Sequence, residues 1–353
     1  MSLTTRGRAT LGVVVALLLV GAGVGAVVLL GGKAGEGTQG TGPTPTTPGT
    51  TASPAGPPVC PLSGVQVSKV PARPALAVKV ENLPAARPQT GLSWADLVYE
   101  EPVEGGITRF IAVYQCQDAS RIEPVRSGRL TDIDVLRQFG TPLFGYAGGV
   151  ARVKGAVKAA GFIDVNYIIA AGAYHRDPNR QAPHNLYTST KELYASAKGK
   201  YQPDPPQPLF TYVPKITGIG KPVTVVHVPF SSSSDVFWRW SKSRKVWLRY
   251  HGDVPHTLSN GTQVSAKNVI VQFVKTELTD ITDANGVRSP RALTVGSGKA
   301  YLFRNGKVIV GTWSRASGKD LTKFTDRQGN EFQLAPGNTW IELLPRPRVP
   351  KIT

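Results

Sequence analysis

A run of 20 residues without a charged or polar side chain, residues 11–30, constrains this chain more than any other feature. About 20 consecutive apolar residues form a helix long enough to span the hydrocarbon core of a bilayer. Arg6 and Arg8 precede the run, whereas a long and nearly uncharged stretch follows it. Because positively charged flanks stay in the cytoplasm, we expect residues 1–10 to be a cytoplasmic tail and the body to lie outside the membrane.

A cleaved secretory signal peptide is the alternative interpretation of this run. Such peptides have apolar cores of about 7–15 residues, followed by a cleavage site with small residues. The core here is longer and no clean site follows it, which favours a retained transmembrane anchor over residues 11–30. No cysteine follows the run directly, which disfavours a lipid attached there. The predicted location is the cell membrane, with one span, the N-terminus inside and the body extracytoplasmic.

Composition divides the remaining chain into a linker and two folded parts. Residues 31–59 are mostly Gly, Thr, Pro, Ser and Ala, which cannot bury enough apolar surface to fold, so we expect a disordered linker. Prolines cluster again between positions 203 and 214. This second cluster predicts a boundary between a first domain, residues 60–205, and a second domain, residues 206–353.

Hydrophobic patterns predict different folds for the two domains. In the first domain, short apolar runs alternate with helical patterns at 131–139 and 151–160, which indicates an α/β domain with Thr131 as a helix N-cap. In the second domain, one apolar run follows another, and Asn305-Gly306 between two runs predicts a tight hairpin. We therefore expect a mostly-β second domain, a sandwich or a barrel. The expected strands are 75–80, 96–99, 107–114, 142–146, 223–228, 236–240, 246–250, 269–274, 300–303, 308–313 and 340–344.

The chain has two cysteines, Cys60 and Cys116. In an extracytoplasmic body, two cysteines predict one disulfide, here between the start of the first domain and the end of the strand at 107–114. A catalytic cysteine is the alternative, but no local motif places a histidine beside either residue.

Several common enzyme motifs are absent from the sequence. It contains no Ser-x-x-Lys, no Gly-x-Ser-x-Gly, no P-loop and no His-Glu-x-x-His. These absences remove common enzyme classes and favour a non-catalytic protein without a cofactor, although an uncommon enzyme remains an alternative.

The net charge is +18, of which +16 belongs to the residues after position 60. A body this basic favours anionic partners, such as wall polymers, phospholipid head groups or nucleic acid. Nucleic acid is the least favoured partner, because only the charge supports it. The alternative is that the charge serves solubility alone.

Polar side chains gather at predicted strand ends between residues 79 and 132. Ligands of open α/β sheets bind at strand ends, and a loop with Arg126, Ser127 and Arg129 before a helix N-terminus can hold an anion. The alternative is an internal salt-bridge network that fixes the loops. The predicted cleft contains Glu81, Asn82, Arg87, Glu100, Glu101, Thr108, Arg109, Arg126, Ser127, Arg129, Asp132, His184 and Asn185.

A second polar cluster contains His175, Asp177 and His184. These residue types can bind a metal, but nothing in their spacing fixes a geometry, so we expect no metal site and a loop ordered beside the first cluster. The isolated His227, His251 and His256 are interpreted as ordinary structural or surface histidines.

Three tryptophans, Trp238, Trp240 and Trp247, alternate with basic residues that include Arg239 and Arg249. The pattern predicts a half-buried hairpin with the tryptophans inside and the charges outside. The alternative is a surface that binds a glycan or a polyanion.

Long motifs spread over residues 60–345 resemble the signature stretches of the YerB-like bacterial envelope proteins. The resemblance implies a domain of unknown function (number 3048) with an N-terminal and a C-terminal half, but no reaction. Family members are typically lipoproteins, whereas this chain has an apolar helix in place of the lipid-accepting cysteine. The motifs are 60–64 (CPLSG), 86–92 (ARPQTGL), 95–100 (ADLVYE), 104–110 (EGGITRF), 124–129 (PVRSGR), Arg180 with 184–187 (HNLY), 311–313 (GTW) and 336–340 (PGNTW).

These observations predict a membrane-anchored extracytoplasmic envelope protein without catalytic activity. Its partner would be a cell-wall polymer or another envelope protein, bound in the cleft around Arg109, Arg126 and Arg129. The alternative is an envelope hydrolase acting on an anionic or glycosidic substrate, with Glu100 or Glu101 as acid or base and the arginines as a charge clamp.

Overall fold

The computed structural model describes residues 56–215, 220–283 and 285–353, which belong to one compact unit. No helix within these ranges is long and apolar enough to cross a membrane. The predicted tail and anchor at 1–30, and all but the end of the predicted linker at 31–59, lie outside the described residues.

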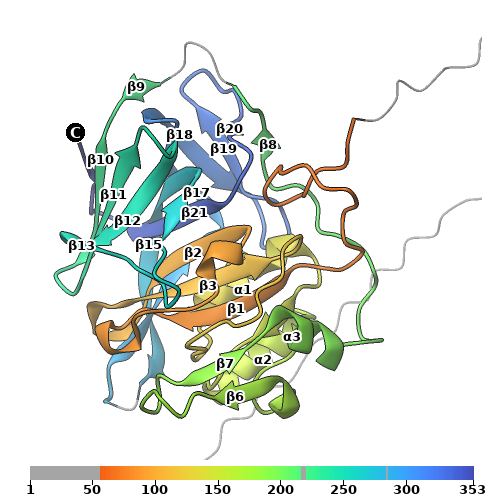
Figure 1. Ribbon diagram of the computed structural model, residues 1–353. Helices are drawn as coiled ribbons and strands as arrows, with labels where there is room; N and C mark the ends of the chain where they lie inside the picture. Colours follow the sequence, from red (N-terminus) through yellow and green to blue (C-terminus); the bar gives the residue numbers. More distant parts are fainter. Residues whose placement is uncertain (1–55, 216–219, 284) are drawn as a thin grey trace, which may run out of the picture. The chain divides into compact units, whose positions relative to one another are not determined.

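A 12-stranded sheet forms the centre of the fold (Figure 1). Its strands are β1 (Leu76–Glu81), β2 (Leu97–Pro102), β3 (Thr108–Tyr114), β4 (Leu143–Gly145), β5 (Ile163–Asp164), β9 (Lys221–Pro222), β15 (Asn268–Thr282), β16 (Arg288–Leu293), β17 (Gly296–Arg304), β18 (Lys307–Arg315), β19 (Lys323–Asp326) and β21 (Thr339–Pro345). Their spatial order is β19-β18-β17-β15-β21-β2-β3-β1-β4-β5, with β16 beside β15 and β9 beside β18. Strands β2 and β21 pair in parallel, with Leu97 opposite Thr339, so the two halves of the chain share one sheet.

A second, 6-stranded sheet packs on one face of the large sheet. It contains β10 (Val225–Ser231), β11 (Ser234–Ser241), β12 (Val246–His251), β13 (Val254–Pro255), β14 (Ser265–Ala266) and β22 (Lys351–Ile352). Two short strand pairs, β6 (Tyr174–Arg176) with β7 (Leu186–Thr188) and β8 (Thr211–Tyr212) with β20 (Gln333–Leu334), complete the strands of the described residues. Trp238 and Trp247 of the small sheet are fully buried in one core with Trp340 of the large sheet.

The helices lie on both faces of the large sheet. Side chains of α1 (Leu130–Leu136) and α2 (Ala151–Ala159) join the core on the face opposite the small sheet, whereas α3 (Thr190–Ser196) joins the core shared with the small sheet. Short 3₁₀ helices are η1 (Pro84–Ala86), η2 (Leu92–Trp94), η3 (Glu104–Gly106), η4 (Arg137–Phe139) and η5 (Ala171–Ala173).

The structure confirms an α/β N-terminal region followed by a mostly-β region, and each expected strand overlaps an observed one. Asn305 and Gly306 form the predicted hairpin turn, with φ of 50° and 67°, the left-handed conformation that such tight turns need. Thr131 is not the N-cap that we predicted, because α1 begins one residue earlier, after Arg129. The carboxylate of Asp132 accepts the backbone N–H of Arg129 at 2.6 Å and fixes this start.

The predicted disulfide is confirmed between Cys60 and Cys116, whose Cα atoms are 6.0 Å apart. Cys116 lies two residues after the end of β3. The buried carboxylate of Asp96 accepts the backbone N–H groups of Gln115 at 2.8 Å and Cys116 at 3.1 Å, which orders the chain at the bridge.

Candidate functional site

The residues of the predicted cleft lie on both faces of the large sheet, because successive side chains of a strand point to opposite faces. The ends of β1 and β2 lie beside the start of β3, with Glu81 opposite Arg109 and Arg109 opposite Glu101. These three residues lie on the face that carries α1 and α2. The residues next to them in sequence lie beneath the small sheet, and they are Asn82, Glu100 and Thr108.

The network beneath the small sheet is centred on Glu100 and Arg249, which are both 0% exposed. Thr108 donates to Oε1 of Glu100 at 2.6 Å, and Nη2 of Arg249 donates to its Oε2 at 2.6 Å. Arg249 also donates to Nδ1 of His256 at 2.7 Å, and Nε2 of His256 lies 2.8 Å from Oε1 of Gln89. Burial and Arg249 hold the pKa of His256 well below its ordinary value, so the ring is neutral, accepts at Nδ1 and donates at Nε2.

Our expectations for this hairpin were right for two tryptophans and wrong for one charge, and Trp240 is half-buried against the same core. Trp238 and Trp247 are buried as predicted, but Arg249 is buried as well. Arg249 lies two residues after Trp247 on β12, so both side chains point to the same, inward face. His256 is not isolated, because it belongs to the same buried network.

A second buried network lies beneath α1. Lys79 forms ion pairs with Glu101 of β2 and with Asp132 of α1, the latter at 2.6 Å, and all three side chains are 0% exposed. Burial raises the pKa of Glu101 to about 7, although the charge of Lys79 opposes this effect. Because one lysine faces two carboxylates, the three side chains together favour holding an extra proton.

Glu101→Gln is expected to weaken the pH dependence of stability. The pKa of Glu101 is higher in the folded protein, so its contribution is fully present below about pH 4.5 and is lost as the pH rises through about 7. We expect the wild type to lose roughly 1–3 kcal/mol more than the variant between pH 5 and pH 8. Urea unfolding at both pH values measures the difference. Equal losses in the two proteins would contradict the assignment of the proton to Glu101.

Four of the predicted residues, Arg109, Arg126, Ser127 and Arg129, line one cavity of about 600 Å³, which we call the arginine cleft. Arg129 forms two charge-assisted contacts with Glu104, at 2.8 Å from Nε to Oε1 and 2.7 Å from Nη2 to Oε2. Burial alone would raise the pKa of Glu104, but the hydrogen bonds and charge of Arg129 outweigh it and lower the pKa to about 2. Nε of Arg126 lies 3.0 Å from Oε1 of Glu81. Two of the three arginines therefore have a carboxylate partner.

Arg109 is the exception in the arginine cleft. It is 5% exposed, and Nη1 donates only to the backbone oxygen of Ser127, at 3.2 Å. Among the described residues, no carboxylate lies within 4.0 Å of its guanidinium nitrogens. Burial, with the charges of Arg129 and Arg126, lowers the pKa of Arg109 to about 10. The site holds a nearly buried cation without a carboxylate in contact, because Glu104 and Glu81 act on it only from beyond 4.0 Å, and an anionic ligand would supply a direct partner.

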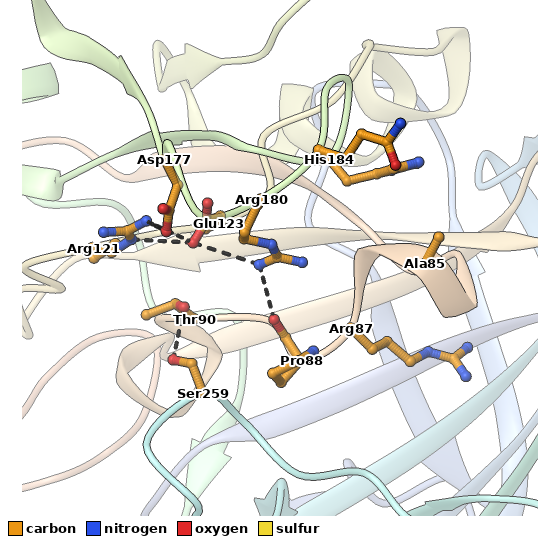
Figure 2. Close-up of a pocket in the computed structure, with 11 residues that line it drawn as sticks. Ala85, Arg87, Pro88, Thr90, Arg121, Glu123, Asp177, Arg180, His184 and Ser259 are labelled. Atoms are coloured by element: carbon orange, nitrogen blue, oxygen red, sulfur yellow. Dashed lines mark hydrogen bonds and ion pairs between the residues drawn. The ribbon is translucent and has the colours of Figure 1, made fainter.

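Two further predicted residues, Arg87 and His184, line a different cavity of about 620 Å³, which we call the Arg87 pocket (Figure 2). Nδ1 of His184 lies 2.8 Å from Oε2 of Glu81. Asn185 lines neither cavity, and its Oδ1 accepts from Arg176 at 2.8 Å. The structure thus distributes the predicted residues other than Asn185 over two cavities, two buried networks and the carboxylate of Glu81 that joins the cavities.

Ion pairs cross one side of the Arg87 pocket. Arg121 pairs with Asp177 and, at 3.0 Å, with Glu123, which also lies 3.5 Å from Arg180. Sequence reasoning did not assign Arg121 and Glu123 to a site. The available signal was their position directly before the 124–129 motif. No group of three or more His, Cys, Asp or Glu side chains in the described part of the chain could hold a metal ion.

Comparison with known proteins identifies the family. Residues 62–203 match "Protein of unknown function (DUF3048) N-terminal domain", and residues 226–341 match the C-terminal domain of the same family. "Putative lipoprotein YerB" of Bacillus subtilis (strain 168) is 30% identical over 296 residues, which cover 81% of this chain and 86% of that protein. A crystal structure of YerB protein from Bacillus subtilis has a TM-score of 0.72 at 26% identity, covering 84% of this chain and 99% of that chain. The chain therefore belongs to the DUF3048 family, as its resemblance to the YerB-like proteins predicted.

Proposed function

We propose that this protein is a membrane-anchored extracytoplasmic envelope protein, and that its arginine cleft binds an anionic cell-wall polymer or the acidic surface of an envelope partner. The relative from Bacillus subtilis is named "Putative lipoprotein YerB", which supports a place at a membrane surface. The apolar run at 11–30 would anchor this chain in place of a lipid, with the N-terminus inside. A C-terminal reporter that is active only outside the cytoplasm tests this orientation.

Arg109 is the single observation that carries the binding proposal. A buried cation normally has a carboxylate partner, because removing it from water is costly. Arg129 and Arg126 have such partners, whereas Arg109 faces the same cleft without one. An anion in the cleft would receive charge-assisted hydrogen bonds from a guanidinium that the fold already holds in place.

The alternative hydrolase function has little support from the positions of its proposed acid and base. Glu100 and Glu101 are 0% exposed, lie on opposite faces of the sheet and line neither cavity. Each is paired with a buried cation, Arg249 or Lys79. A carboxylate in such a position cannot reach a substrate without unfolding its network.

Arg109→Met is expected to reduce binding to purified cell-wall sacculi at least tenfold at near-physiological salt. The expected loss corresponds to a charge-assisted hydrogen bond of about 1.5–3 kcal/mol. Methionine keeps much of the side-chain volume and breaks no ion pair, so the variant should unfold at the same urea concentration as the wild type or a higher one. A pelleting assay with sacculi measures the binding.

Arg239→Met is the matched control, because it removes the same charge from an exposed side chain that lines neither cavity. It should bind sacculi as the wild type does. If both variants bind equally and salt abolishes binding, only bulk charge acts and the cleft proposal fails. The double variant Arg126→Ala, Arg129→Ala should also lose binding, but it leaves Glu81 and Glu104 without partners, so its folding must be verified first.

A further inference from the structure

We propose that the Arg87 pocket is a second anion subsite, and that the ligand is a linear polyanion that occupies the arginine cleft and the Arg87 pocket together. This inference rests on the proposed function of the arginine cleft and specifies the class of its ligand: a chain in which anionic groups recur, as along a phosphate backbone.

Arg87, which is half-buried, shares with Arg109 the lack of a carboxylate contact. Its Nη2 donates to the backbone oxygen of Asn82 at 2.9 Å, and its Nε donates to the side-chain oxygen of Asn82 at 3.4 Å. Within the described ranges, no carboxylate lies within 4.0 Å of its guanidinium nitrogens. Figure 2 shows the Arg87 side chain directed away from the ion pairs of Arg121, and no dashed contact reaches it. Burial and the charge of Arg249 lower the pKa of Arg87 to about 10.

The other charges of the pocket balance one another. Arg121 and Arg180 face the carboxylates of Glu123 and Asp177, and Arg180 also donates to the backbone oxygens of Ala86 at 2.7 Å and Pro88 at 3.0 Å. These bonds hold the turn that carries Arg87. The charge of Arg87 has no partner among these groups and is opposed only by Glu100 from beyond 4.0 Å, so an anion in the pocket would supply a direct partner.

The two cavities are neighbours. Leu83 lines the arginine cleft and Ala85 lines the Arg87 pocket, and two residues of chain span at most about 7 Å. One carboxylate also joins them: Glu81 contacts Arg126 of the cleft through Oε1 and His184 of the pocket through Oε2. A ligand bound in one cavity therefore lies close to the other cavity.

A linear polyanion uses this arrangement better than two separate anions. Once one anionic group is bound, the next is held near the second cavity at a high effective concentration, which multiplies the affinity without further contacts. The charge of +16 after position 60 would attract such a chain from solution.

Defined phosphate chains test the inference with the full-length protein in mild detergent at near-physiological salt. Calorimetric titration with pyrophosphate should give two sites per chain in the wild type, one in Arg87→Met, one in Arg109→Met and none in the double variant. A chain of about ten phosphates should bind the wild type once, and either single substitution should weaken it roughly tenfold or more. Arg87→Lys should give an intermediate affinity, because it keeps the charge and loses the planar fork of donors.

The outcomes separate the two proposals. If Arg109→Met weakens the ten-phosphate chain and Arg87→Met does not, the second subsite is disproved while the function of the arginine cleft stands. If neither substitution changes binding, both proposals fail. If the exposed Arg239→Met weakens the chain as much as Arg87→Met, bulk charge explains the binding and the second subsite is again disproved. Equal urea midpoints of the variants and the wild type ensure that a loss of binding is not a loss of folding.

Discussion

Arg249→Met is expected to lower the free energy of unfolding by about 3–5 kcal/mol, because the substitution leaves a buried carboxylate without its cation. Glu100 would remain fully buried beneath the small sheet. Beside it on β21 lies Glu342, also 0% exposed, whose pKa is raised well above its ordinary value by burial and by Glu100. Two neighbouring buried carboxylates would then share a site that no longer holds Arg249. Urea unfolding monitored by tryptophan fluorescence measures the loss.

A second substitution distinguishes charge from packing. Adding Glu100→Gln to Arg249→Met removes the unpaired carboxylate, so at least about 1 kcal/mol of the lost stability should return. Arg239→Met on the neighbouring strand β11 is the matched control. Its side chain is 37% exposed and pairs with an exposed aspartate, so little change is expected. If Glu100→Gln makes the Arg249 variant still less stable, packing and not charge determines the effect.

Local sequence patterns predicted most of the long strands and the first two helices, but not α3, β16 or β19, nor how the two halves meet. Apolar runs place β1, β2, β3 and the strands of the second half, because burial of a strand is visible in its own residues. The parallel pairing of β2 with β21 has no such signal, because the two strands are far apart in the chain and the residues of one strand do not indicate which strand it pairs with. A long-range pairing of this kind is decided by the packing of the whole core.

The candidate site was predictable in composition and only partly in geometry. The residues that we selected at the strand ends do lie close together, but alternation along the strands divides Glu100 from Glu101 and Thr108 from Arg109. That division could have been inferred from the sequence, as could the burial of Arg249 from its spacing to Trp247. The cavities could not, because each combines segments from distant parts of the chain: Asp283 and Asn285 lie beside Arg126 in the arginine cleft, and Ser259 lies beside Arg87 in the Arg87 pocket.

Replacing both cysteines with serine is expected to lower the free energy of unfolding by about 4 kcal/mol. The disulfide joins residues 56 positions apart, and the chain-entropy model gives about this value for a loop of that length. The effect should reach the whole unit, because the bridge joins Cys60 to the first half at Cys116, and two hydrogen bonds join the segment after Cys60 to the second half. The hydroxyl of Tyr212 donates to the backbone oxygen of Leu62. The backbone N–H of Gly337 donates to the backbone oxygen of Ser63 at 2.8 Å.

The contacts of Leu62 and Ser63 determine how urea unfolding of the cysteine variant should differ from that of the wild type. Leu62 is 0% exposed and Ser63 1% exposed, so the segment cannot leave its place without uncovering core that both halves share. The urea midpoint should therefore fall for the whole unit in a single transition, and a reducing agent should shift the wild type to the midpoint of the variant. An unchanged midpoint, with new protease cleavage confined to residues near Cys60, would mean that the segment detaches alone and that the bridge stabilises only the start of the folded unit.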